Sequence, residues 1–360
     1  MAQYHRAEAL AALGHTVHVL VVKAWRPGRS RLWSPPIAAG VSTELVQHPS
    51  VPRLRFAELS LAMLSLFVAV RYRQVVQRQA YDVVHVHTER MALAVGLHQR
   101  PLKLPTLVSL HAADSTPQIV RVHCKRRRLA RALGNADHVV LVGDVLKRYF
   151  GPCLNPASTT TLHNGFKLEK DSGPDPTRWQ GAMRLVSVSR LFEGKGLHLV
   201  LQALAQLRPG LDWTYEVIGS GPEESRLQTL AAQLGVADRV TFLGPLPHEV
   251  VMKRLASAEV FVLPSFYEAF GVAHLEAMAA GCLTIGVDGQ GPSEFIESGR
   301  TGYLVPPRDV DSIVEVLRAV IADPDSSRLI AEAGQRTARS EKTWDAHARA
   351  LETIYAGLIN

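Results

Sequence analysis

Cysteine is scarce in this sequence. Its 360 residues include three cysteines, Cys124, Cys153 and Cys282, which are odd in number, far apart and without a CxxC pair. This usage argues against a disulfide framework and against a zinc cage, and it is typical of a reducing compartment. We therefore expect a cytoplasmic protein.

Long apolar runs are also missing. The most apolar stretch, residues 56–70, contains Glu58 and is shorter than the roughly 20 residues that a membrane-spanning helix requires. Residues 1–13 lack the apolar core of a signal peptide. We find no repeats and no low-complexity tract, so the sequence predicts globular domains without a membrane span.

The charge balance is basic. The formal net charge is +7 and the pI is about 9.4, which indicates an anionic partner or the mild basicity of many soluble proteins. The densest basic stretch is HCKRRRLARAL, residues 123–133. It is either a solvated helix face or a peripheral contact with anionic lipid at the inner membrane face. No nucleic-acid partner is expected.

Short apolar runs alternate with helical patterns, which is typical of parallel sheets covered on both faces. The expected strands of the first half are 16–22, 41–46, 83–87, 106–110, 138–142 and 159–162. Those of the second half are 184–189, 215–219, 240–243, 260–264, 283–286 and 303–305. We therefore expect two doubly wound, Rossmann-like α/β domains that face a central ligand cleft.

A polar stretch rich in Gly and Pro interrupts this alternation and predicts a linker. The expected organisation is an N-terminal domain, a linker, a C-terminal domain and a final helix that returns to the N-terminal domain. Their bounds are 1–172, 173–182, 183–342 and 343–360.

One candidate binding loop follows the strand at 184–189. Arg190 and Lys195 lie in SRLFEGKG, and two cations at a strand's carboxyl end can neutralise a pyrophosphate. A solvated basic loop is the open alternative.

A second candidate loop lies in PSFYEAFGVAHLEAMAAG, where a strand passes through a loop with Glu268 into a helix with Glu276. Gly281 ends this helix. Free N–H groups at the helix start suit a phosphate, and carboxylates accept hydrogen bonds from sugar or ribose hydroxyls. By itself, the spacing of the glutamates equally fits an ordinary surface helix.

Two other patterns are weak. VIGSGPEE half-matches a dinucleotide fingerprint, but Glu224 stands where the third glycine belongs, so Gly219 and Gly221 more simply allow close backbone approach. Asp309 and Asp323 begin Asp-x-Asp strings at expected helix starts, where Asp is a normal capping residue. We therefore expect neither a nicotinamide nor a metal site.

The segments SRLFEGKG, VIGSGPE, FLGPL, PSFYEAFGVAHLEAMAAG and GQGPSEFIESGRTGYLVPPRD together strongly resemble family 4 glycosyltransferases. The resemblance covers essentially the whole chain, most firmly residues 183–340. It implies a GT-B fold and a retaining, metal-independent enzyme without a cofactor, which takes a sugar from a UDP- or GDP-sugar. Within the family the chain looks most like bacterial cell-surface polysaccharide transferases, such as the teichuronic-acid type, with a glycan or lipid-linked acceptor.

The resemblance assigns roles to residues of the C-terminal half. Arg190 and Lys195 match the cations that hold the donor diphosphate and stabilise the departing nucleotide. Glu268 matches a glutamate beside the transferred sugar, and Glu276 matches one that binds the ribose. The other donor-binding positions that it implies are Gly219, Gly244, Leu246, Phe270, Gly271, Val272 and Glu294.

Three histidines of the N-terminal half lie in expected strands or directly after one. His111 resembles the family's histidine near the transferred sugar, where its carbonyl or imidazole would stabilise an oxocarbenium ion. It completes the implied catalytic set with Arg190, Lys195 and Glu268, although a satisfied histidine at a strand end is equally open. His85 and His87 alternate on one face of DVVHVH, but no third ligand is spaced to complete a metal site, so structural roles are expected.

The order of the first elements differs from that expected for a doubly wound domain, because a helical pattern over 2–13 precedes the first strand. In the family such a helix follows an initial strand and a glycine-bearing loop. We therefore expect that this first strand is missing, through a start assigned too far downstream or through truncation. The second explanation leads to the alternative function, a truncated and catalytically impaired sugar-nucleotide-binding protein.

Overall fold

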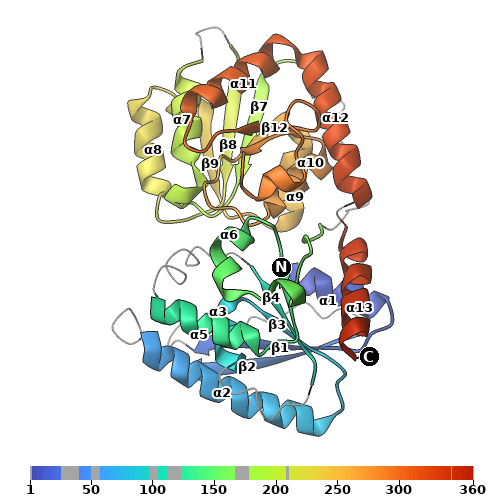
Figure 1. Cartoon of the computed structure of the whole chain (residues 1–360). Helices are drawn as coiled ribbons and strands as arrows, with labels where there is room; N and C mark the ends of the chain where they lie inside the picture. Colours follow the sequence, from blue (N-terminus) through green and yellow to red (C-terminus); the bar gives the residue numbers. More distant parts are fainter. Residues whose placement is uncertain are drawn as a thin grey trace. The chain divides into compact units, whose positions relative to one another are not determined.

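The computed structural model describes residues 2–25, 40–49, 57–96, 104–111, 123–166, 178–207, 211–341 and 343–359. The chain divides into two compact units (Figure 1). Unit 1 is Met1–His163 with Trp344–Asn360, and unit 2 is Asn164–Thr343. The predicted boundaries at 172 and 342 remain predictions, and residues 173–177 of the predicted linker lie outside the described residues.

The described strands of unit 1 form two parallel sheets. One has two strands, and the other has four in the order β3-β4-β5-β6. The strands are β1 (Val17–Trp25), β2 (Val41–Pro49), β3 (Val84–His87), β4 (Thr106–Leu110), β5 (His138–Leu141) and β6 (Thr159–Thr161). All six expected strands of this half are present, with differences only at their ends.

Helices pack against these sheets. They are α1 (Ala2–Ala12), α2 (Ala57–Arg78), α3 (Glu89–Gly96), α5 (His123–Gly134), α6 (Leu146–Phe150) and α13 (Trp344–Ile359), with short 3₁₀ turns at Gly151–Cys153 and Pro156–Ser158. β4 is buried at all five positions, as expected for an interior parallel strand. The C-terminal helix α13 packs against α1, and residues of both helices share a core cluster with Leu107 of β4.

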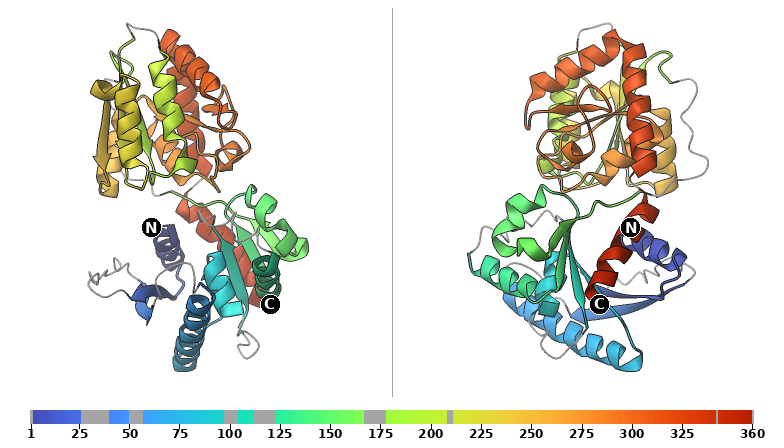
Figure 2. Two further views of the ribbon diagram at one scale, coloured as in Figure 1. Left: turned by 90° about the vertical axis from the view of Figure 1, so that its left-hand side faces the viewer. Right: turned by 45° about the vertical axis from the view of Figure 1, so that its right-hand side comes forward.

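Unit 2 contains one parallel six-stranded sheet in the order β12-β11-β10-β7-β8-β9. Its strands are β7 (Met183–Val188), β8 (Trp213–Ile218), β9 (Val240–Gly244), β10 (Val260–Val262), β11 (Leu283–Val287) and β12 (Tyr303–Val305). Its α-helices are α7 (Leu197–Ala205), α8 (Glu224–Gln233), α9 (His248–Ser257), α10 (Val272–Ala280), α11 (Val310–Ala322) and α12 (Pro324–Glu341). Figure 2 shows helices on both faces of this sheet, so the doubly wound α/β class predicted from the alternation is confirmed.

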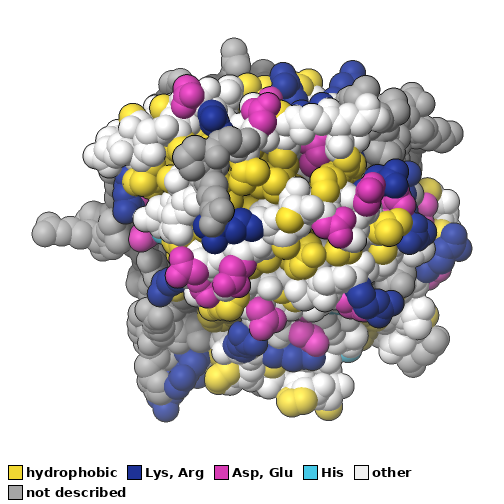
Figure 3. All heavy atoms as spheres, turned by 90° about the horizontal axis from the view of Figure 1, so that it is seen from above, with side chains coloured by type: hydrophobic (Ala, Val, Ile, Leu, Met, Phe, Trp, Pro, Cys, Tyr) yellow, Lys and Arg dark blue, Asp and Glu magenta, His cyan; other side chains and the backbone are white. Residues whose placement is uncertain are grey.

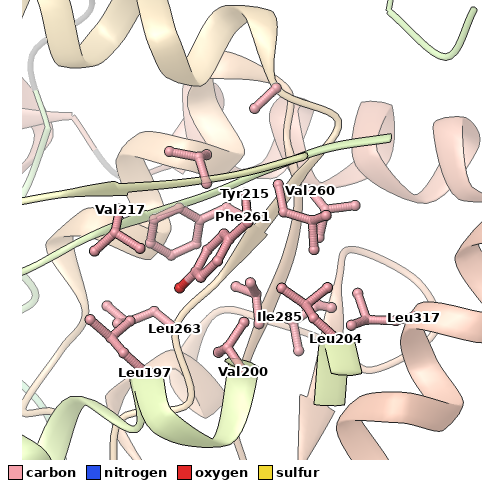
Figure 4. Packing of buried hydrophobic residues seen from close by; sticks show 14 of the residues in the cluster. Leu197, Val200, Leu204, Tyr215, Val217, Val260, Phe261, Leu263, Ile285 and Leu317 are labelled. Atoms are coloured by element: carbon pink, nitrogen blue, oxygen red, sulfur yellow. The ribbon is translucent and has the colours of Figure 1, made fainter. Parts of the chain in front are cut away.

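The core of unit 2 explains why its strands are nearly continuous apolar runs. Tyr215 and Phe261 of the sheet pack against Leu197, Val200 and Leu204 of α7 (Figure 4). Burial of such side chains contributes roughly 1.5–3 kcal/mol each to the stability of this unit.

The surface is mixed in charge where Figure 3 shows it, with Lys and Arg side chains interspersed with Asp and Glu. Within the described ranges, no helix combines the length and the apolarity needed to cross a bilayer. Cys153 and Cys282 are buried free thiols.

Candidate active site

The strand order of unit 2 places a reversal between β7 and β10. From β7 the chain winds through β8 to β9, whereas β10, β11 and β12 extend the sheet on the other side of β7. In open parallel sheets, ligands bind at the carboxyl ends of the strands beside such a reversal. The loops that follow β7 and β10 are therefore the expected place for a ligand, and they carry the cations and the first glutamate predicted from the sequence.

The loop after β7 contains both predicted cations. Arg190 is exposed, and its guanidinium lies 4.4 Å from the ring centroid of Phe192. Lys195 ends the 3₁₀ turn Glu193–Lys195 and is followed by Gly196, which has a left-handed φ of 72° and precedes α7. A Cβ on Gly196 would lie 2.3 Å from the Pro264 carbonyl oxygen, so glycine lets the β7 loop contact the end of β10.

Gly219, in the loop after β8, fits closely against the end of β7. Its φ is 129°, and a Cβ there would lie 1.8 Å from the Ser189 carbonyl oxygen. Its amide donates a hydrogen bond to the Gly244 carbonyl, 2.9 Å away, which joins the loops of β8 and β9. The prediction that this glycine allows close backbone approach is confirmed, and the close packing positions the residues that follow β7.

Glu268, in the loop after β10, reaches the β7 loop. Its Oε2 accepts a hydrogen bond from Lys195 Nζ at 2.9 Å, and both side chains are less than one-fifth exposed. The Glu268 backbone is also held, because its amide donates to Gln290 Oε1 and its carbonyl accepts from the Gly291 amide. The structure thus brings together one predicted cation and one predicted carboxylate from loops 73 residues apart.

The start of α10 provides the backbone part of the site. Gly271 precedes the helix and Val272 begins it, as the sequence predicted, so the first-turn amides and the positive dipole end lie directly after the Glu268 loop. Phe270 is buried and packs on Phe295, with ring centroids 5.2 Å apart. Glu294 ends the adjacent 3₁₀ turn Gly291–Glu294.

Glu276, one turn further along α10, contacts the start of α9. Its Oε1 lies 3.1 Å from Nε2 of His248, the first residue of α9. Glu268, by contrast, contacts Lys195 of the β7 loop. Gly244 ends β9, and Leu246 lies in the short loop between β9 and α9, so the segment predicted to hold the base leads into the histidine that contacts the glutamate predicted to hold the ribose. Sequence reasoning missed His248, and no spacing pattern links it to Glu276.

His274 is a second residue that the sequence reasoning missed. It lies in the first turn of α10, is fully buried, and contacts the Leu263 carbonyl through Nε2 at 2.9 Å. Its Nδ1 has no hydrogen-bond partner within the described part of the chain. Burial lowers its pKa to about 4, while nearby Glu268 favours the charged form, so the ring is neutral at physiological pH. A polar residue inside an otherwise apolar helix pattern was the available signal.

His111, predicted beside the transferred sugar, belongs to unit 1 and follows β4. Its Nε2 lies 3.4 Å from Nδ1 of His87, which ends β3. Arg6 of α1 is 2% exposed and contacts the same His87 nitrogen at 2.9 Å. Burial, followed by the charge of Arg6, lowers the pKa of His111 to about 3. His87 of β3 thus contacts both Arg6 and His111, and the structural role expected for His85 and His87 stays a prediction.

The Asp-x-Asp strings have the capping role that was predicted. Asp309 accepts from the Ser312 amide at the start of α11, and Asp323 accepts from the Ser326 amide near the start of α12.

Comparisons with known proteins cover both units. Residues 176–337 match the family model described as Glycosyl transferases group 1, and residues 4–170 match that of Glycosyltransferase Family 4. Glycogen synthase of Mycobacterium tuberculosis is 30% identical over 298 residues, which cover 76% of this chain and 68% of that protein. A GDP-mannose-dependent alpha-(1-6)-phosphatidylinositol monomannoside mannosyltransferase of Mycolicibacterium smegmatis is 30% identical over 251 residues. These residues cover 64% of this chain and 65% of that protein.

Solved structures show the same architecture. Sucrose-phosphate synthase from Thermosynechococcus elongatus gives a TM-score of 0.83 at 23% sequence identity, with 98% of this chain and 91% of that chain covered. At this identity the similarity concerns the fold.

Proposed function

The chain belongs to family 4 of the glycosyltransferases, retaining enzymes of the GT-B fold with nucleotide-sugar donors, and we propose that it binds its donor at the β7–β10 reversal of unit 2. The observation that carries this proposal is the contact between Lys195 and Glu268, which joins the loops on either side of the reversal.

The cations act on the leaving group in this proposal. When the bond between the sugar's anomeric carbon and the diphosphate breaks, negative charge accumulates on the departing nucleotide diphosphate. Lys195 supplies a point charge and Arg190 can donate two parallel hydrogen bonds, and both groups stabilise that charge more than they stabilise the bound donor. The N-terminus of α10 adds backbone donors at Gly271 and Val272.

The two glutamates bind different parts of the donor. Glu268, beside Lys195, accepts hydrogen bonds from hydroxyls of the transferred sugar, while Glu276, beside His248, accepts them from the ribose. Their separate contacts support this division. Gly219, Gly244, Leu246, Phe270 and Glu294 complete the proposed donor site; they shape its loops and the base pocket.

His111 is the proposed contribution of unit 1, which is the acceptor-side domain. A neutral imidazole there can stabilise a developing oxocarbenium ion, because it offers an unprotonated nitrogen instead of a positive charge. Its lowered pKa supports this role.

The acceptor is proposed to be a glycan or a lipid-linked glycan of a cell-surface polysaccharide, of which a teichuronic-acid type is one instance. A peripheral contact with anionic membrane would bring the enzyme to such an acceptor. Two features of unit 1 support it: Arg127, Arg128 and Arg131 are exposed on α5, and α2 exposes apolar side chains at Leu66 (59%), Phe67 (39%) and Val70 (50%).

No metal or cofactor is needed in this proposal, because Lys195, Arg190 and the α10 amides neutralise the diphosphate. Release of sugar from a panel of UDP- and GDP-sugars, measured with and without EDTA, tests it. We expect one donor to be consumed equally well in both conditions. Consumption that EDTA abolishes and manganese restores would contradict the metal-free proposal, and the absence of consumption of any donor would contradict the enzymatic one.

A further inference from the structure

The glutamate proposed to bind the ribose is held by a side chain of the neighbouring helix. Glu276 Oε1 on α10 lies 3.1 Å from Nε2 of His248, the first residue of α9. We propose that His248 is a positioning residue for nucleotide binding, which fixes the Glu276 carboxylate through Oε1 and leaves Oε2 to accept hydrogen bonds from the ribose hydroxyls. The inference rests on the proposed role of Glu276 and adds a residue that acts through it.

The chemistry of the two groups gives this contact its direction. An ionised carboxylate offers acceptors only, so the imidazole donates from Nε2 to Glu276 Oε1. The neutral ring with its proton on Nε2 and the charged ring make the same bond, so the contact does not depend on the charge of His248. A hydrogen bond to a charged acceptor is also stronger than one between neutral groups. The bond can therefore hold the carboxylate in one orientation.

Both partners project from helices that the core of unit 2 anchors. Leu255 of α9 is fully buried, and its carbonyl accepts a hydrogen bond from Cys282 Sγ, 3.0 Å away and just beyond the end of α10. Leu275 and Ala277, on either side of Glu276 in α10, are buried as well. The two helices also pack against each other. Side chains that project from fixed helices meet in a defined geometry, as a binding site requires.

The pair is nevertheless within reach of a ligand. The His248 side chain is 32% exposed and the Glu276 side chain 19% exposed. Gly244 and Leu246, in the segment proposed to hold the base, lie two to four residues before His248. The contact thus connects the base segment to the ribose glutamate, and a nucleoside bound there would meet a carboxylate that is already oriented.

Orienting this carboxylate in advance favours binding. A glutamate side chain without a partner samples many rotamers, and a ligand that requires one of them must order the side chain when it binds. His248 removes most of that cost before the nucleotide arrives. The alternative is a contact that only stabilises the packing of α9 on α10, and that role predicts nucleotide affinity that is independent of His248.

The test is calorimetric titration of the full chain with UDP or GDP, whichever binds, and with the 2′,3′-dideoxy form of the same nucleotide, which lacks the ribose hydroxyls. The variants are His248→Ala, His248→Phe and His248→Gln, the last of which keeps an N–H donor near the position of Nε2. Glu276→Ala, alone and together with His248→Ala, completes a cycle that isolates the pair. Glu249→Ala is the matched control, because Glu249 is an exposed residue in the same turn of α9.

We expect His248→Ala and His248→Phe to bind the ribonucleotide about threefold to tenfold more weakly, because one more side chain must be ordered on binding. Binding of the dideoxy form should be unchanged, and the loss should disappear in the Glu276→Ala background. His248→Gln should restore most of the affinity, and Glu249→Ala should match the wild type. The donor KM should rise with kcat nearly unchanged, because the ribose takes no part in the chemical step.

Unchanged or tighter ribonucleotide binding in His248→Ala would overturn the proposal, and the same result in His248→Phe would do so if the alanine variant does not fold. Equal losses for the two nucleotides, or a loss that persists in the Glu276→Ala background, would overturn it as well, since His248 would then act elsewhere. If Glu276→Ala itself leaves ribonucleotide affinity unchanged, the proposed role of Glu276 fails, and the inference fails with it.

Discussion

Lys195 Nζ and Glu268 Oε2 lie 2.9 Å apart although their loops follow different strands of the unit 2 sheet. Glu268→Gln removes the negative charge beside the cation while keeping the side chain's size. Because partly exposed ion pairs contribute about 0.2–1 kcal/mol, we expect UDP or GDP to bind up to about fivefold more tightly. Turnover should fall by roughly tenfold or more, because a charge-assisted bond to the sugar is lost.

Calorimetric titration measures the affinity for UDP or GDP, and steady-state kinetics measure turnover, so the two predicted effects of Glu268→Gln are observed separately. Glu297→Gln is the control, since Glu297 is 62% exposed and pairs with Arg300 outside the site. Weaker nucleotide binding together with normal turnover in Glu268→Gln would show that the carboxylate has been given the wrong role.

The close approach of Gly219 to Ser189 predicts a large effect of one methyl group. Gly219→Ala would place Cβ 1.8 Å from a carbonyl oxygen, so the end of β7 must move. We expect unfolding free energy to fall by about 3 kcal/mol, from strain of about 1–2 kcal/mol and overpacking of about 1–3 kcal/mol.

Gly235→Ala separates these two causes, because Gly235 also has a positive φ of 71° but open space around its Cβ position. For Gly235→Ala, urea denaturation should show only the loss of unfolding free energy that backbone strain causes, about 1–2 kcal/mol. Equal losses in the two proteins would mean that the β7–β8 loop contact is not tight.

The buried histidines of unit 1 predict loss of stability in acid. Their folded pKa values, about 3 for His111 and His347, lie below the ordinary 6.5, so the unfolded chain binds more protons as pH falls. The stability is fully present above about pH 6.5 and decreases between pH 6.5 and 3, by up to about 1.4 kcal/mol per histidine per pH unit.

Urea unfolding of the full chain at pH 7.5 and at pH 5.5, followed by a spectroscopic signal that arises from unit 1, measures this dependence. His347→Gln should reduce the slope, because it removes one of the buried rings whose pKa is lowered. A stability that is constant or higher at pH 5.5 would be incompatible with neutral buried rings.

The strands, the cations Arg190 and Lys195, and the start of α10 could be predicted from the sequence, because each is determined by local apolar pattern, glycine or spacing. The contact of Arg6 with His347 could not, since it joins residues 341 positions apart. The same is true of the pair between His248 and Glu276, which depends on how α9 packs beside α10. Long-range side-chain pairing follows from tertiary packing, and local patterns do not encode it.

The exposed arginines of α5 predict binding to anionic vesicles that decreases as salt rises, because the attraction is screened over about 10 Å at 0.1 M salt. Serine at Arg127, Arg128 and Arg131 should abolish this binding in a vesicle sedimentation assay. Replacing Arg226, Arg300 and Arg328, three exposed arginines of unit 2, with serine changes the net charge equally and should leave binding intact. No binding at low salt, or equal loss in both triple variants, would make α5 an ordinary solvated face.

The most direct measurement of the donor-site assignment is calorimetric titration of UDP and GDP into the wild type and Lys195→Met. The account predicts that one nucleotide diphosphate binds the wild type, and that Lys195→Met weakens this binding by about tenfold to a hundredfold, the equivalent of a charge-assisted hydrogen bond of about 1.5–3 kcal/mol. Equal affinity in the two proteins, or no binding of either nucleotide to the wild type, would contradict the assignment of the β7–β10 reversal as the donor site.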